Sequence, residues 1–400
     1  MQEHPLGNRD LIRAINRSNV LNTIKTKGSI SRIEIARSTG LSAATVTGIT
    51  ADLIADGFVY EKEEGDSRGG RRPILLAINP RGGYVVGIKL MEDHAIGAIT
   101  DLEATIVAKY SSKLKDKSLD TGIESLVEVV NELMGAGGIV SEQLLGVGVG
   151  LAGIVNAKKG VLRYSPYFGW HDVPLVEILR SRLKVPVHID NDVNTLTLNE
   201  QLFGTGQGKE NFITVTIGRG VGLGIVVNGQ IYRGGNGGGG EFGHTIIDPE
   251  GHQCDCGKKG CLETYVSDPA LLRLAFEAAS RGELPEEPKN VNELIAYAKS
   301  GVSVAQSIIA QGGVTLGYGI ANLINIFNPQ EVIISGEGVR AGELMFEPMR
   351  ATIAQYVMPG LAEDTDICID VWEDDAWARG AASLVLQELF KSPIYKGKKE

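Results

Sequence analysis

Three cysteines and two histidines gather in one short stretch of the chain, and these residue types bind transition metals. The candidates are His244, His252, Cys254, Cys256 and Cys261. One imidazole and three thiolates make a closed tetrahedral set of the kind that holds structural zinc, and Gly257 and Gly260 allow the loop to turn back on itself. Either histidine can be the fourth ligand, although His252 lies so close to Cys254 that simultaneous chelation would be tight. We expect one structural zinc ion per chain, in preference to unmetallated cysteines.

A second polar feature is the pair Asn191-Asp192. It follows a predicted strand, Val187 to Ile189, and precedes a predicted helix, Val193 to Phe203. Side chains at such a strand-to-helix turn project from the carboxyl edge of a sheet into a cleft, where they can bind a ligand. The alternative is that the aspartate caps the helix, and the two roles are compatible.

The first eighty residues alternate helical patterns with turns. Apolar residues at a helical period over Asn8 to Lys25 predict one amphipathic helix or two short ones. Ser31 and Glu34 have the spacing of a capping box, and Gly40 marks the end of that helix. Ser42 is the N-cap of a third helix.

The third helix carries small side chains near its start, where a recognition helix brings short side chains to base edges in the major groove. They are Ser42, Ala43, Ala44, Thr45 and Thr47. A β-ribbon follows, Phe58 to Lys62 and Pro73 to Ile78, and its loop carries Arg68, Arg71 and Arg72. This order predicts a winged helix-turn-helix whose partner is double-stranded DNA. A small helical protein-interaction module with solvated arginines is the alternative.

Charge and composition narrow the class of protein. The formal net charge is −10, but residues 1–80 carry +2 and the rest carry −12, so only the front end suits nucleic acid. Four cysteines, three of them clustered, argue for a local metal site in a reducing compartment rather than for disulfides. The apolar runs are shorter than the ~20 residues that a bilayer requires, and Met1 to Asp10 lacks a signal-peptide core. We expect a cytoplasmic protein.

The remaining residues alternate strand and helix patterns in two similar runs. The first run has strands at Tyr84 to Lys89, Ala95 to Thr100, Thr105 to Tyr110 and Gly146 to Leu151, and a helix at Ile123 to Leu133. The second has strands at Phe212 to Ile217, Gly222 to Val227 and Glu331 to Ser335, and a helix around Val304 to Phe327. These patterns predict three parts: a DNA-binding domain over 1–80, a first α/β lobe over 81–190 completed by a C-terminal helix at 377–390, and a second lobe over 191–376. Cys368 falls in an ordinary strand.

Several short sequence motifs resemble those of one protein family. Three of these motifs lie in the N-terminal domain: Ser31-Arg32-Ile33-Glu34-Ile35-Ala36, Thr39-Gly40-Leu41-Ser42 and Gly69-Gly70-Arg71-Arg72-Pro73. They look like the DNA-binding domain of ROK-family transcriptional repressors, and Glu241-Phe242-Gly243-His244 before the cysteine loop matches the ROK pattern. The resemblance extends from Asn8 to Gln387, and Phe168 to Pro174 is similar to the xylose-repressor branch. It implies a ribonuclease-H-like (actin-like) fold of two α/β lobes with a sugar bound in the cleft between them.

The same resemblance implies roles for individual residues. His244 becomes the fourth metal ligand, together with Cys254, Cys256 and Cys261. The residues expected at the sugar are Gly153, Asn191, Asp192, Glu241, His244 and Glu263. In ROK kinases the aspartate of the Asn-Asp pair is the general base, and without a phosphate donor it can still bind sugar. Trp170 either stacks on the sugar or packs in the core. Family members act as homodimers or homotetramers on inverted repeats, so a homo-oligomer is expected.

The glycine turns distinguish a repressor from a kinase. ROK kinases carry Asp-x-Gly-Gly-Thr in the first lobe to hold ATP phosphates, whereas Gly87 to His94 lacks the Gly-Gly pair and the threonine, and Glu92 and Asp93 would repel phosphate. The turns Ile217 to Gly222 and Ser335 to Gly338 survive as remnants. We therefore predict a repressor of sugar-utilisation genes that responds to xylose or glucose, with no catalytic residue. The alternatives are an ATP-dependent sugar kinase and a repressor gated by a protein partner.

Overall fold

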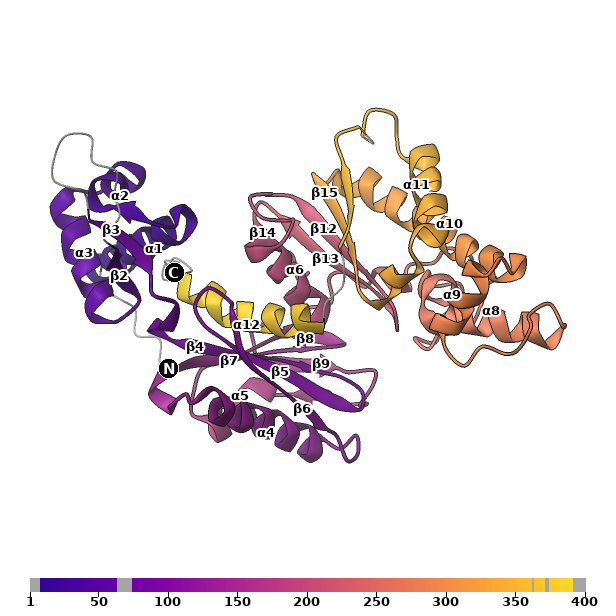
Figure 1. Cartoon of the computed structure of the whole chain (residues 1–400), viewed down its shortest axis with the longest axis horizontal. Helices are drawn as coiled ribbons and strands as arrows, with labels where there is room; N and C mark the ends of the chain where they lie inside the picture. The colour runs from indigo at the N-terminus through magenta and orange to yellow at the C-terminus, as the bar shows by residue number, and fades with distance from the viewer. Residues whose placement is uncertain (1–7, 63–73, 362, 371–373, 391–400) are drawn as a thin grey trace, which may run out of the picture. The chain divides into compact units, whose positions relative to one another are not determined.

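The computed structural model describes residues 8–62, 74–361, 363–370 and 374–390 (Figure 1). The chain forms two compact units. Unit 1 comprises Met1–Leu151, Pro166–Asp190 and Ala381–Glu400, and unit 2 comprises Ala152–Ser165 and Asn191–Gly380. We predicted an uninterrupted first lobe over 81–190, but residues 152–165 group with unit 2. The reason is local: the Gly153 carbonyl accepts a hydrogen bond from Asn191, and the Val155 backbone lies directly against Gly237.

The front of unit 1 is a three-helix domain with a small sheet. Its elements are α1 (Asn8–Lys27), β1 (Ile30–Ser31), α2 (Arg32–Thr39), α3 (Ala43–Ala55), β2 (Val59–Lys62) and β3 (Leu75–Ile78). Residues 8–27 form one continuous helix rather than two. Ser31 and Glu34 make the predicted capping box, Gly40 ends α2 in the left-handed conformation, and Ser42 caps α3. The strands pair in the order β1-β3-β2, which attaches the wing strands to the start of α2.

The rest of unit 1 is an α/β layer. Its elements are η1 (Pro80–Gly82), β4 (Tyr84–Leu90), β5 (His94–Thr100), β6 (Ile106–Lys113), α4 (Leu119–Gly137), η2 (Ser141–Gln143), β7 (Leu144–Leu151), β10 (His171–Val173), α5 (Leu175–Leu183) and β11 (Val187–Asn191). The sheet order is β11-β7-β4-β5-β6, with β4 parallel to β7 and antiparallel to β5. Helices α4 and α5 cover one face of this sheet, and the end of α12 (Asp374–Phe390) covers the other (Figure 1).

Unit 2 repeats this plan. Its elements are β8 (Ile154–Asn156), β9 (Val161–Tyr164), α6 (Asp192–Phe203), β12 (Phe212–Ile217), β13 (Val221–Val227), β14 (Gln230–Ile231), η3 (Phe242–His244), α7 (Glu263–Val266), α8 (Asp268–Ser280), α9 (Val291–Lys299), α10 (Ser303–Phe327), β15 (Glu331–Ser335), η4 (Glu337–Ala341), α11 (Glu343–Tyr356) and β16 (Asp366–Ile369). The sheet order is β14-β13-β12-β15-β16. Helix α6 packs on one face, where Gly222 and Gly224 admit it closely, and the main core with α8–α11 fills the other.

Helix α10 bears on the expectation that no segment crosses a membrane. We expected no segment long enough to cross a membrane, but α10 passes that test by length and composition. Most of its apolar surface is used inside unit 2, where Ile309, Leu316, Ile320 and Ile324 are fully buried in the core. A mostly buried helix of this kind is a core helix.

Candidate functional site

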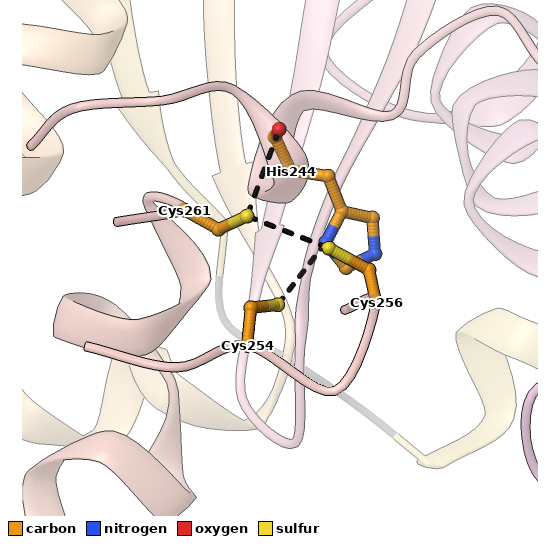
Figure 2. Close-up of side chains that lie close together, drawn as sticks. All are labelled: His244, Cys254, Cys256 and Cys261. Carbon is orange, nitrogen blue, oxygen red and sulfur yellow. Dashed lines mark hydrogen bonds between the residues drawn. The ribbon is translucent and has the colours of Figure 1, made fainter. Parts of the chain in front are cut away.

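His244, Cys254, Cys256 and Cys261 converge in unit 2, and their ligand atoms all lie within 4.8 Å of one another (Figure 2). The Nδ1 atom of His244 lies 3.6 Å from the sulfur of Cys254, and the sulfurs of Cys256 and Cys261 are also 3.6 Å apart. Thiolates bound to one zinc ion at ~2.3 Å lie about this far from each other. The donor set therefore suits a single tetrahedral metal ion.

Electrostatics favour a cation at this position. Burial raises the pKa of the Cys254 thiol, and burial together with the neighbouring thiols raises that of Cys261 to about 12. Thiols this close ionise together only beside a positive charge, and a metal ion supplies it. The residues present thus fit a divalent metal that prefers sulfur and nitrogen donors.

His252, the other candidate ligand, is held elsewhere. The Nη1 atom of Arg273 lies 3.1 Å from its Nδ1 atom, and its ring packs against Tyr265 with centroids 5.2 Å apart. Arg273 also donates to the carbonyl of Thr264, 3.0 Å away. The cluster around the thiols therefore contains His244 and not His252. Arg273 instead connects His252 to the Thr264 carbonyl.

The polar pair at residues 191 and 192 lies where the sequence predicts, at the start of α6. Asn191, not the aspartate, is the N-cap, because its Oδ1 accepts from the Val193 N–H at 2.8 Å. Its Nδ2 donates to the carbonyl of Gly153, 3.1 Å away. Gly153 has a φ of 121°, and a Cβ there would lie 2.1 Å from the carbonyl oxygen of Tyr164, so only glycine fits. The loop at Gly153, called the 153 loop below, is thereby held by a hydrogen bond to the beginning of α6.

Four of the predicted sugar ligands influence one another. Glu241 has an exposed side chain, yet the surrounding protein desolvates its carboxylate and raises its pKa; His244 lowers the pKa, and Glu263 and Asp192 raise it further. Glu263 is fixed by the Val221 N–H, which donates to its Oε2 at 2.9 Å. An accessible carboxylate beside two others and an imidazole can accept several hydroxyl protons, as a polyol ligand requires. The contact to Val221 has no signal in the sequence.

Trp170 belongs to the core of unit 1. Its ring stacks on Phe168 at 4.3 Å between centroids, its Nε1 donates to the Lys117 carbonyl at 3.0 Å, and Gly122 gives it room. Only 7% of its surface is exposed. This favours core packing over the stacking role that the sequence left open.

Acidic side chains occupy both glycine turns that hold ATP phosphates in kinases of this fold. In the first turn, Glu92 pairs with Lys117 at 2.7 Å, and Asp93 pairs with His94 at 2.6 Å. In the second, the Glu337 carboxylate sits over Gly218, 2.8 Å from where a Cβ would be. A phosphate group in either place would meet a carboxylate, which repels it.

The recognition helix has the surface that the sequence predicts. Ser42, Ala43, Ala44, Thr45 and Thr47 are all exposed, while Val46, Ile49 and Leu53 are buried on the opposite face. The hydroxyl of Thr47 donates to the Ala43 carbonyl at 2.8 Å, which leaves the outer face short and even. The wing residues Arg68, Arg71 and Arg72 lie outside the described residues.

Three arginines of this domain are already paired, which the sequence did not reveal. Arg13 contacts Asp52 at 2.7 Å, and Arg17 contacts Asp56 at 2.6 Å, so α1 and α3 share two ion pairs. Arg32 donates both to the buried Thr50 on α3 and to Glu61 on β2. These side chains position the recognition helix and the wing strand, and their charge is largely neutralised within the protein.

Comparisons with known proteins agree with this fold and site. The model of the ROK family matches residues 85–388, and a winged helix-turn-helix DNA-binding model matches residues 13–60. The chain is 32% identical to the xylose repressor of Caldicellulosiruptor bescii, over 98% of this chain and all of that one.

Two similar solved structures match different shares of this chain. A ROK family transcriptional regulator, described as a homologue of the Escherichia coli MLC protein, matches with a TM-score of 0.85 and 28% identity, over 95% of this chain and 97% of that one. A ROK family glucokinase from Streptomyces griseus, in complex with glucose and AMPPNP, matches with a TM-score of 0.66 and 26% identity, over 76% of this chain and 99% of its own. The predicted winged helix-turn-helix and two-lobed α/β architecture is confirmed, and the chain belongs to the ROK family.

Proposed function

We propose that this protein is a DNA-binding transcriptional repressor of sugar-utilisation genes, and that a sugar bound by unit 2 modulates its binding to the operator. One observation carries the proposal: a single chain joins an exposed recognition helix to a ROK domain that has the residues predicted to bind sugar but has carboxylates at both glycine turns. A sugar kinase does not need a recognition helix, and a repressor gated only by a protein partner does not need sugar-binding residues.

The sugar is held by hydroxyl–carboxylate hydrogen bonds. Asp192, Glu241 and Glu263 accept protons from ring hydroxyls, and the Gly153 backbone, fixed by Asn191, lies beside them. His244 turns Nδ1 toward the thiols, which leaves Nε2 for a hydroxyl. Xylose or glucose is the effector that we expect, because the relatives described above are a xylose repressor and a glucose-bound kinase.

Zinc is the metal that we propose for the His244, Cys254, Cys256 and Cys261 set, one ion per chain. With four protein ligands the site has no open position for a reacting water, so its role is structural. It holds the His244 ring and the segment before α7 in place for the sugar. No residue of the chain is proposed as catalytic.

DNA binding sets the assembly that we propose. A recognition helix reads one half-site, and inverted repeats require two such helices related by two-fold symmetry. The protein is therefore a homodimer or homotetramer in the cytoplasm. Linkage gives the response: a sugar that prefers the form with low operator affinity weakens operator binding by the same factor that DNA weakens sugar binding.

A ligand screen tests the function. Purified protein is heated with xylose, glucose, N-acetylglucosamine, their phosphates or ATP, because a ligand of the folded state raises the unfolding midpoint. The same ligands are then added to the protein bound to a labelled duplex that it has selected from a random library. We expect a shift with one free sugar, none with ATP, and a change in DNA affinity with that sugar. A shift with ATP that grows with sugar would instead indicate a kinase, and no shift at all would indicate a protein partner.

A further inference from the structure

Helix α12 is shared by the two units. Its residues up to Gly380 belong to unit 2, and its residues from Ala381 to Phe390 belong to unit 1 (Figure 1, yellow). A helix is stiff over this length, because each residue after the first turn is tied to the residue four positions earlier. The contacts at its two ends are therefore mechanically connected.

In unit 2, α12 rests on the helix that begins at the proposed sugar site. A Cβ at Gly380 would lie 2.5 Å from the carbonyl oxygen of Thr195, so the backbones of α12 and α6 touch there. Trp377 and Leu196 are buried beside this contact. The hydroxyl of Thr195 donates to the carbonyl of Asp192 at 2.7 Å. The contact of α12 with α6 thus lies within one helical turn of the proposed sugar ligand Asp192.

In unit 1, α12 lies on strand β7 through a second close backbone contact. A Cβ at Gly148 would lie 1.8 Å from the carbonyl oxygen of Ala381, and one at Gly146 would lie 3.0 Å from Val385. Such contacts leave no space for the helix to approach the sheet more closely.

The C-terminal end of α12 docks on one face of α1. Ser18 Oγ and Asn22 Nδ2 both donate to the Phe390 carbonyl, at 2.9 and 2.6 Å. The Lys25 ammonium lies 4.2 Å from the centroid of the Phe390 ring. The last carbonyls of a helix lack partners within it and carry partial negative charge, so two donors and a cation are a suitable cap. Residues 18, 22 and 25 are spaced to share one helical face.

The same helix α1 holds the recognition helix. Arg13 and Arg17, one turn apart, pair with Asp52 and Asp56 of α3. A series of direct contacts therefore links the start of α6, through α12 and α1, to the recognition helix.

We propose that α12 transmits the state of the sugar site to the recognition helix, and that Ser18, Asn22 and Lys25 are the positioning residues that dock its end. The inference rests on the proposed function for the identity of the ligand, but the dock itself does not depend on it. This dock, the contacts of Ser18, Asn22 and Lys25 with Phe390, can break reversibly, because it consists of two hydrogen bonds and one cation–π contact. The backbone contacts at Gly380 and Gly148 are much closer. A dock of this strength can form and break within the range of a ligand's differential binding energy.

The test removes the two donors and leaves α1 otherwise intact. The double variant Ser18→Ala/Asn22→Ala loses both hydrogen bonds to Phe390, and Lys25→Met separately loses the cation. The control Asn19→Ala/Thr23→Ala likewise removes one amide and one hydroxyl side chain from the same helix, where the Thr23 hydroxyl donates within α1 to the Asn19 carbonyl. For each full-length protein, two quantities are measured: the change in DNA affinity caused by xylose, glucose or N-acetylglucosamine, and the change in amide hydrogen exchange of residues 194–196 caused by the selected duplex.

We expect the parent and the control to show both effects, with a change in DNA affinity in the range of about 5- to 150-fold that is common for coupled sites. In Ser18→Ala/Asn22→Ala the change in affinity should fall below about twofold, and DNA should no longer alter exchange at the start of α6. Unchanged coupling in both the double variant and Lys25→Met would overturn the proposal, as would a parent in which DNA leaves α6 exchange unaltered. If no sugar affects the parent but DNA still alters α6 through the dock, the sugar assignment fails and the transmission through α12 stands.

Discussion

The side-chain amide of Asn191 joins two segments of unit 2, because its nitrogen donates to the Gly153 carbonyl at 3.1 Å while its oxygen caps α6 through the Val193 N–H at 2.8 Å. One residue thus fixes both the loop that brings backbone to the proposed sugar site and the helix that carries Asp192. An aspartate at position 191 would preserve the cap and lose the donor. The two functions of the amide can therefore be separated.

We expect Asn191→Asp to weaken sugar binding about tenfold, which corresponds to about 1.4 kcal/mol, because the 153 loop loses its tether and meets a carboxylate. Asn191→Ala removes the cap as well and should lower the free energy of unfolding by about 1 kcal/mol for that reason alone. Titration calorimetry with the active sugar and chemical denaturation give the two quantities. Unchanged affinity in both variants would show that the loop position does not matter for the sugar.

Asp192→Ala should separate sensing from DNA binding. The residue lies at the first position of α6 in unit 2, so its loss should leave the affinity for the selected duplex within about twofold while sugar no longer changes that affinity. Asp120→Ala is the matched control, because Asp120 is also an acidic residue in the first turn of a helix, α4, and is exposed. Sugar-dependent release that persists in Asp192→Ala would refute the placement of the ligand.

Local patterns predict the elements of this chain well. The sequence predicts strands at Phe212 to Ile217 and Glu331 to Ser335 with the bounds that β12 and β15 have, because buried β-branched runs between turn residues have few alternatives. The capping box at Ser31 and the glycine at position 40 likewise place α2 to the residue. The three cysteines of the metal set are predictable because they are close in sequence, whereas spacing left His244 and His252 both open and only the family resemblance favoured His244.

Relations between distant residues are what the sequence does not predict. Arg13 and Asp52 are 39 positions apart, and Ser18 and Phe390 are 372 apart, so no spacing rule connects them. The same holds for the Glu337 carboxylate over Gly218 and for the return of residues 152–165 to unit 2. Each depends on how the elements pack, and packing follows from the whole set of side chains rather than from any window of them.

Thr47→Ala should alter which DNA sequences the protein prefers. Thr47 is exposed in the first half of α3, where a methyl group and hydroxyl can meet base edges, so we expect a change of about 1 kcal/mol in the discrimination between sites. Binding to unrelated DNA and its salt dependence should stay the same, because no phosphate contact is lost. Selection from a random library, repeated with parent and variant, measures the preference.

Thr23→Ala is the control for this substitution, since the Thr23 hydroxyl bonds to the Asn19 carbonyl as that of Thr47 bonds to the Ala43 carbonyl, each at 2.8 Å. A loss of affinity for all sequences alike in Thr47→Ala would place phosphate rather than bases beside this residue.

Sugar binding should weaken as the pH falls from 7 toward 5. Desolvation by the surrounding protein, with Glu263 and Asp192 nearby, raises the pKa of Glu241, so on acidification its carboxylate is protonated before an ordinary glutamate is and then accepts fewer hydrogen bonds from hydroxyl groups. Folding stability responds in the opposite sense: between the unfolded and the raised folded pKa the folded state binds more protons, so the contribution of Glu241 to stability falls as pH rises through that window. Calorimetric titrations at several pH values give the affinity.

In Glu241→Gln we expect weaker sugar binding at pH 7 and a flatter pH profile, because the titrating group is gone. Metal content is followed in the same samples, since the neighbouring His244 and the thiols release metal in acid. A profile as steep in Glu241→Gln as in the parent would assign the pH dependence to another group.

Cys256→Ser should remove zinc and sugar response together. Cys256 is the exposed member of the set, so its replacement disturbs packing least while it takes away one of four ligands. Without the ion, the His244 ring loses the contact that orients it, and changes of this kind typically cost 10- to 100-fold in affinity or activity. We expect sugar affinity to fall by about that factor, with zinc measured by atomic absorption in the same protein.

Cys368→Ser, outside the cluster, is the control and should keep both zinc and response. A chelator should reproduce the loss in the parent and add nothing in Cys256→Ser, because both act on one ion; full zinc occupancy with an unchanged response in Cys256→Ser would mean that the loop holds its metal, and the sugar site its shape, without this thiol.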